Sequence, residues 1–282
     1  MRSFLYFKGQ TPRNHFGWLI FLFLLPLVEA QQISSVSPRT AIAGEPVELE
    51  FTGKDLGLSG DGKLSILASF ACQQEIISEV PKPPADGKEA KTRNKVRLKV
   101  TLKKDTPVGV GWLRLVTSMG ITPPILFLVD DLPTRKADPK SHRDEAILID
   151  PPLAIESRTP NLDVHYYKLE GRSGQRIAIE VFGSRLGEDV DAVLKLLDAE
   201  GRILAASDDE PGSGTDPRLS HVFRENETAY IEVREVRYQG GKFYRLRVGD
   251  FPLPMAAFPM LAQAGMKTSF ASVGPPGETS LS

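Results

Sequence analysis

Short runs in which apolar and polar residues alternate most constrain the fold of this chain. Residues 47–51 (VELEF), 95–100 (KVRLKV) and 112–116 (WLRLV) each place residues of one kind at every second position. Successive side chains of a β-strand point to opposite faces, so this period predicts half-buried strands. Since no long segment carries the 3.6-residue period of an amphipathic helix, we expect an all-β protein.

The expected strands fall into two groups, which predicts two β-sandwich domains. The first covers residues 31–132 and ends in the apolar run 123–129 (PPILFLV). The polar stretch 133–145 is interpreted as a linker, and residues 146–250 form the second domain. Its expected strands are 164–169, 176–181, 192–197, 203–205, 230–234 and 243–248. The loop 198–201 (DAEG) predicts a hairpin turn in which Gly201 has a positive φ.

The N-terminus has the pattern of a secretory signal peptide over residues 1–30. Three basic residues precede the apolar run 16–28 (FGWLIFLFLLPLV), and the small residues that follow fit a signal-peptide cleavage site after Ala30. The alternative is an uncleaved anchor, but the run is shorter than the roughly 20 residues that a spanning helix needs. We therefore expect a secreted or extracytoplasmic protein, in the periplasm or at the cell surface, with no transmembrane span in the mature chain.

Composition excludes some classes of partner and of stabilisation. The formal net charge is −1, which argues against bulk nucleic acid as a partner. Cys72 is the only cysteine, so no intramolecular disulfide can form, and its apolar surroundings indicate a buried thiol. A secreted domain of this kind rests on its hydrophobic cores or on bound metal.

An acidic stretch over residues 188–216 suggests a calcium site. It holds nine acidic residues against two basic ones, and Asp189 and Asp191 would share one face of a strand. If the following loop folds back, carboxylates converge and must take protons, disperse into water or bind a cation. The candidate ligands are Asp189, Asp191, Asp208, Asp209 and Asp216. The stretch fails the EF-hand pattern, and a solvated acidic loop remains the alternative.

A basic strand is the second candidate site. Lys91, Arg93, Lys95, Arg97 and Lys99 occupy every odd position while apolar residues hold even positions from 96 onward. One interpretation is a patch for an anionic polysaccharide or lipid surface. The other is an edge or solvent face whose lysines discourage aggregation, favoured because no aromatic residues interleave as nucleic-acid binding prefers.

The sequence offers no catalytic residue that we would assign. The histidines of the expected mature chain, His142, His165 and His221, are widely spaced. Neither the zinc-protease motif HExxH nor the nucleophile motif GxSxG is present. His165 lies in an alternating strand, where a packing residue is expected.

The tail, residues 251–282, contains an internal repeat of the first domain. Pro38, Gly44 and Gly53 recur as Pro259, Gly265 and Gly274, at a constant offset. This pattern predicts a truncated copy of the first domain's opening. Three alternatives remain open: a disordered remnant, a strand that docks on another domain, and chance.

Two family resemblances follow from these residues. Residues 33–53 resemble the opening of an IPT/TIG immunoglobulin-like domain. Residues 145–250 resemble the bacterial pre-peptidase C-terminal (PPC) domain, through 163–169, 174–175, 189–191, 196–202, 207–209 and 244–248. That resemblance implies a small jelly-roll-like β-sandwich without catalytic residues, found beside the catalytic domains of secreted proteases. It is similar in fold to collagen-binding modules that bind calcium. His165 stands where relatives often carry Asp.

These observations predict a secreted, non-catalytic binding or accessory protein, whose partner is a protein or polysaccharide at the cell surface. One alternative is a protease-associated or hydrolytic chain, which rests on the catalytic domains beside which such domains are found. The other is a structural spacer or assembly subunit whose tail docks on a partner.

Overall fold

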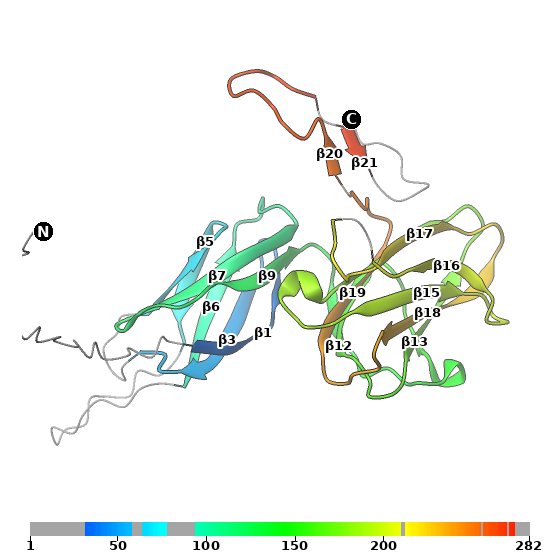
Figure 1. The fold of residues 1–282 in the computed structure, drawn as a ribbon, viewed down its shortest axis with the longest axis horizontal. Coiled ribbons are helices and arrows are strands. Elements are labelled where there is room, and N and C mark those ends of the chain that lie inside the picture. The colour runs from blue at the N-terminus through cyan, green and yellow to red at the C-terminus, as the bar shows by residue number, and fades with distance from the viewer. Residues whose placement is uncertain are drawn as a thin grey trace, which may run out of the picture. The chain divides into compact units, whose positions relative to one another are not determined.

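The computed structural model of the protein describes residues 32–57, 64–77, 94–209, 212–254, 256–269 and 271–273. Strands make up nearly all of its regular structure (Figure 1), which confirms the all-β fold class. The expected signal peptide lies outside the described residues, as do Lys91 and Arg93 of the basic strand. No helix in the described part of the chain is long and apolar enough to cross a membrane.

Two sheets make up the first sandwich. One has the order β1-β3-β6-β5, and its strands are Gln32–Ser37, Pro46–Lys54, Lys95–Leu102 and Cys72–Ile76. The other has the order β2-β9-β7-β4, and its strands are Thr40–Ile42, Ile125–Asp130, Gly109–Thr117 and Ser65–Ala68, with β8 (Gly120–Ile121) paired to β7. Alternation places every second side chain between the sheets, where Leu49, Phe51, Leu98, Leu113 and Phe127 form the core.

Two five-stranded sheets make up the second sandwich. The first has the order β10-β12-β19-β14-β17, over Thr134–Lys136, Leu153–Arg158, Phe243–Gly249, Arg176–Phe182 and Arg218–Val222. The other has the order β11-β13-β18-β15-β16, over Ile147–Leu148, His165–Gly171, Glu227–Glu235, Ala192–Leu197 and Ile203–Ser207. Their core includes Ile155, Tyr167, Ile179, Leu194 and Tyr244.

The structure confirms the turn between β15 and β16. Gly201 has φ 88°, and its N–H donates to the Asp198 carbonyl over 3.0 Å. Other elements differ from the sequence-based expectation. β10 lies in the stretch interpreted as a linker and pairs in parallel with β12, and a short 3₁₀ turn, Arg143–Glu145, follows there. β12 and β17 were not expected.

The tail forms a short hairpin. β20 (Ala256–Phe258) and β21 (Ala271–Val273) pair antiparallel in a two-stranded sheet. Among the described residues neither strand joins another sheet. A two-stranded hairpin alone is marginal in water, so packing on something larger would stabilise it.

Candidate functional site

A network of buried charged side chains connects the end of β9 with the sheet that contains β19. Arg245 on β19 is fully buried and donates two hydrogen bonds to Oδ2 of Asp130, from Nε over 2.8 Å and from Nη2 over 2.6 Å. Its Nη1 also reaches Oε1 of Glu156 over 3.2 Å. Burying a charge is costly unless it is paired and hydrogen-bonded, and this guanidinium meets both conditions.

Arg247 extends this network. It lies two residues after Arg245 on the same strand, so both side chains point to the same face of the sheet. Its Nε donates to Oδ1 of Asp130 and its Nη2 to Asp131, each over 3.1 Å, while its Nη1 pairs with Glu180. Burial alone would raise the pKa of Asp130, but Arg245 and Arg247 hold that pKa below its usual value. Burial opposes the charge of Arg247, yet Glu180 and Asp130 raise its pKa.

Asp216 is the last member of this network of buried charges, and its side chain is fully buried. Its Oδ1 accepts the N–H groups of Gly183 and Ser184, over 3.0 and 2.7 Å. Its Oδ2 accepts the N–H and Nε of Arg185, over 3.0 and 2.9 Å, and Nη2 of Arg185 returns to Glu180 over 3.3 Å. Asp216 therefore holds the backbone of the 3₁₀ turn Ser184–Leu186 and orients the Arg185 guanidinium.

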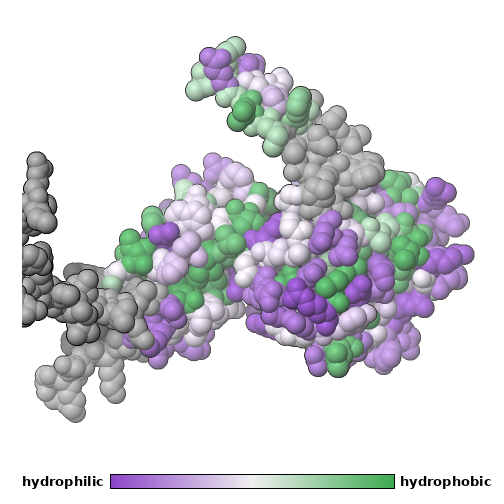
Figure 2. All heavy atoms as spheres, in the orientation of Figure 1, coloured by the Kyte–Doolittle hydropathy of each residue, from purple (hydrophilic) through white to green (hydrophobic). Residues whose placement is uncertain are grey.

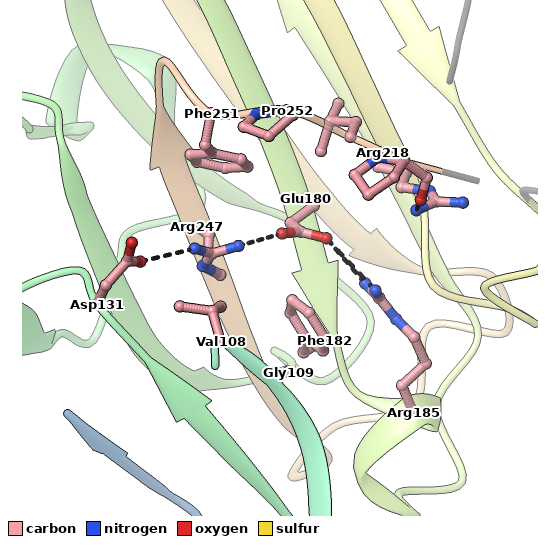
Figure 3. Close-up of a pocket in the computed structure, with 12 residues that line it drawn as sticks. Val108, Gly109, Asp131, Glu180, Phe182, Arg185, Arg218, Arg247, Phe251 and Pro252 are labelled. Carbon is pink, nitrogen blue, oxygen red and sulfur yellow. Dashed lines mark hydrogen bonds and ion pairs between the residues drawn. The ribbon is translucent and has the colours of Figure 1, made fainter. Parts of the chain in front are cut away.

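A cavity of about 330 Å³ opens beside this network of buried charges. Figure 3 shows Asp131, Arg247, Glu180 and Arg185 joined in a row across it. The guanidinium of Arg185 lies 3.6 Å from the ring centre of Phe182, and that of Arg247 lies 4.4 Å from that of Phe251. These two stacked pairs give the cavity planar walls. Arg218 also lines the cavity, and its Nη1 donates to the carbonyl of Pro254 over 2.8 Å.

Two histidines have packing roles. His165 is buried, and its Nδ1 lies 2.7 Å from the hydroxyl of Tyr244, which in turn lies 2.6 Å from that of Tyr167. Burial lowers the pKa of His165 to about 4, against the opposing effect of Asp138 and Asp163. His221 packs edge-on against Phe223 with ring centres 5.0 Å apart, and burial lowers its pKa too. A neutral, buried imidazole such as His165 is a poor general base at pH 7.

The structure brings three of the five candidate calcium ligands together. Carboxylate oxygens of Asp191, Asp208 and Asp209 all lie within 4.8 Å of one another. Burial and the charges of Asp209 and Asp208 raise the pKa of Asp191. Asp189 instead lies 3.5 Å from Nζ of Lys242, and the oxygens of Asp216 are engaged as described.

The described part of the basic strand lies in the middle of a sheet. Lys95, Arg97 and Lys99 are exposed on β6, which has β3 on one side and β5 on the other. Opposite them on β3 stand Glu50 and Glu48, and Nζ of Lys95 lies 2.9 Å from Oε1 of Glu50. The solvent face that we expected is present, but β6 is not an edge strand, and acidic neighbours offset its charge.

The network of buried charges was not predicted from the sequence. The usable signal was the alternation in residues 243–248, which sets Arg245 and Arg247 on one face just as it set the basic residues of β6. No partner was visible, because Asp130 is 115 residues from Arg245.

Comparison with known proteins gives only distant structural likenesses. No family model and no curated protein matches the chain. The pre-peptidase C-terminal domain of a collagenase from Bacillus anthracis is 17% identical, with a TM-score of 0.31, and the match covers 37% of this chain and 94% of that domain. PliG from Aeromonas hydrophila, a periplasmic inhibitor of g-type lysozyme, is 11% identical, with a TM-score of 0.30 and coverage of 42% and 96%.

A third similar structure is the secreted serine protease VesC from Vibrio cholerae. It is 10% identical, with a TM-score of 0.26, and the match covers 78% of this chain and half of that one. A PPC domain is thus among the similar structures, while the IPT/TIG resemblance stays a prediction. At these TM-scores the likenesses carry no argument about function.

Proposed function

We propose that this chain is a secreted, non-catalytic binding or accessory protein of the bacterial cell surface or envelope. One observation carries the proposal: the tail hairpin exposes four large apolar side chains. Phe258 is 67% exposed, Met260 82%, Leu261 87% and Met266 63%. Figure 2 shows apolar residues on this hairpin, with polar residues among them.

Such a surface is unfavourable in water unless something covers it. Exposed apolar groups that gather in one place mark interaction sites, whereas single ones are ordinary. Lys267 is the only charged residue between positions 256 and 273, so the hairpin lacks the charges that keep a free surface soluble. A protein partner fits this surface best, and a polysaccharide remains the other class that we expect.

The non-catalytic part of the proposal is supported by the state of the polar groups. Beside the cavity Arg185 is paired with Glu180, and Arg247 with Asp131 and Glu180. His165 has a pKa of about 4. Chemistry at neutral pH needs a group poised to accept or donate a proton, and its lowered pKa holds His165 away from that condition.

The structural spacer has one observation in its favour. Asp130 at the end of β9 and Arg245 on β19 form a fully buried ion pair, which ties the first sandwich to the second. A spacer needs such a tie. It gives no reason for the exposed apolar tail, so we rank the binding role first.

Calcium binding by Asp191, Asp208 and Asp209 is proposed as a stabilising accessory to this role. Three carboxylate oxygens within 4.8 Å repel one another, and calcium accepts six to eight oxygen ligands with flexible geometry. The remaining ligands would be water or backbone carbonyls.

The binding role is tested on isolated envelopes of the source bacterium. We expect the mature chain to sediment with them and the variant Phe258→Ser/Leu261→Ser to bind at least tenfold more weakly. The matched control Leu148→Ser/Ile203→Ser removes side chains that are 61% and 60% exposed on the second sandwich, and it should bind normally.

Two outcomes would contradict the proposal. One is equal sedimentation of both double variants and the unchanged chain. The other is a peptidase or glycosidase activity of the purified chain that disappears on replacing His165 or His221. Prior protease treatment of the envelopes separates a protein partner from a polysaccharide.

A further inference from the structure

The tail hairpin repeats three of the five residue pairs that join β1 to β3. In the first sandwich Ser35 pairs with Thr52, Val36 with Phe51, and Ser37 with Glu50. In the tail Ala256 pairs with Val273, Ala257 with Ser272, and Phe258 with Ala271. Each tail pair lies 221 positions after its counterpart, so the strand register is the same, as the sequence repeat predicts.

The turn inside the hairpin is repeated too. The N–H of Glu45 donates to the carbonyl of Ile42 over 3.1 Å, and the N–H of Met266 donates to that of Gln263 over 3.1 Å. Gly44 has φ 83° and Gly265 φ 81°, a left-handed conformation that favours glycine in both copies. These matches are independent of the strand pairing, and together they define one backbone unit present twice.

In the first copy this unit has a partner on its open side. β3 pairs with β1 on one edge and with β6 on the other, through seven residue pairs. The N–H of Gly53 donates to the carbonyl of Asn94 just before β6, over 2.9 Å. Since N–H groups alternate along a strand, that of Phe51 faces β6 as well. Ser272 corresponds to Phe51, so its N–H faces the edge of β21 that pairs with no other described strand.

The first copy also buries positions that the tail leaves exposed. Two of them lie on β2, which pairs with β9 in the other sheet. Thr40 and Ala41 are each 5% exposed in the first sandwich. Their counterparts are Leu261, which is 87% exposed, and Ala262, which is also exposed. The second copy therefore shows, at the same backbone positions, the surface that strand and sheet partners bury in the first.

We propose that this edge of β21, with which no other described strand pairs, is a docking site for an antiparallel β-strand of another protein, which pairs with it as β6 pairs with β3. The inference rests on the proposed binding function and names the mode of binding and the kind of partner. Strand addition takes its affinity from backbone hydrogen bonds and its specificity from alternate side chains.

β6 indicates the chemistry of the incoming strand. Its Val96, Leu98 and Val100 are buried against the core, while the residues between them point outward. The partner strand accordingly has apolar residues at alternate positions and no proline in the paired stretch.

A synthetic peptide of residues 94–102 (NKVRLKVTL) is the probe, because it contains the strand that occupies the first copy. It is labelled with a fluorophore and titrated with the mature chain while anisotropy is measured. We expect saturable binding, at least tenfold weaker to Ser272→Pro. Proline is tolerated on an edge strand where the N–H faces outward, so this change removes one edge donor and leaves the pairing with β20. The control Ser272→Thr keeps the N–H and should bind normally.

Three results would overturn the inference: no binding of the peptide at millimolar protein, equal binding to Ser272→Pro, or self-association of the chain that Ser272→Pro abolishes. The last would make a second copy the occupant. Envelope binding that survives in Ser272→Pro but not in Phe258→Ser/Leu261→Ser would remove strand addition and leave the proposed function. Peptide binding without envelope binding would contradict the proposed function and leave strand addition.

Discussion

Arg245 and Asp130 form an ion pair from which water is excluded on both sides. The exposed fraction of each side chain is 0%, and Nη2 and Oδ2 are 2.6 Å apart. Thr40, Thr134 and Glu156 supply further oxygens to the same guanidinium. The pair joins the last residue of β9 to a central strand of the second sandwich, so its loss should be felt in the stability of both.

Asp130→Asn should lower the free energy of unfolding by about 3 kcal/mol, because it leaves Arg245 and Arg247 buried beside fewer opposite charges. The measurement is denaturant unfolding followed by circular dichroism, together with calorimetry to reveal separate transitions. Asp131→Asn is the matched control: this side chain is 63% exposed in its pair with Arg247, and its loss should cost less than about 1 kcal/mol. Equal effects of the two changes would contradict the structural role of the buried pair.

Stability should fall as the pH drops from 6.5 towards 4 because of His165. Burial lowers the pKa of His165 to about 4 from an ordinary value of 6.5. Between these values the unfolded state binds the proton and the native state does not, so acid favours unfolding by up to about 1.4 kcal/mol per pH unit.

The slope is measured by unfolding at a series of pH values. His165→Gln should flatten it, and His142→Gln, at an exposed position, should keep it. A slope that persists unchanged in His165→Gln would assign the proton to another group.

The strands that could be predicted from sequence are those whose buried and exposed residues alternate by polarity. β6 is such a strand, with apolar residues inward and basic residues outward. β12 was missed because four successive residues, 154–157, are buried and two of them, Glu156 and Ser157, are polar. Glu156 can be buried because Arg245 and Thr40 donate to it, and a single sequence does not reveal those distant partners.

The acidic stretch shows the same limit at a site. Its high charge was visible, but carboxylates that look alike in sequence have separate roles in the structure. Asp191 lies beside Asp208 and Asp209, Asp189 faces Lys242, and Asp216 accepts backbone N–H groups. The fold of the loop decides which carboxylates meet, and residue spacing alone did not determine it.

Asp216→Ala should destabilise the second sandwich by about 2–4 kcal/mol. The change leaves the N–H groups of residues 183–185 and Nε of Arg185 without their acceptor, and a buried polar group that loses its partner is costly. Thermal unfolding measures the loss. Asp189→Ala is the control, because that side chain is 79% exposed and its removal should have little effect. A stability equal to that of the unchanged chain would contradict this assignment of Asp216.

Calcium should raise the melting temperature of the mature chain if Asp191, Asp208 and Asp209 bind it. An ion that binds only the native state adds RT ln(1 + [L]/Kd), which is about 1 kcal/mol when calcium is fivefold above its Kd. The measurement compares melting in millimolar calcium with melting in chelator. Asp191→Asn/Asp208→Asn should abolish the rise, while Asp189→Asn should retain it because Asp189 lies beside Lys242 instead. Removing calcium from the unchanged chain should then restore the repulsion among the three carboxylates and lower stability. No shift in the unchanged chain, or an equal shift in the double variant, would dispose of the site and leave a solvated acidic loop.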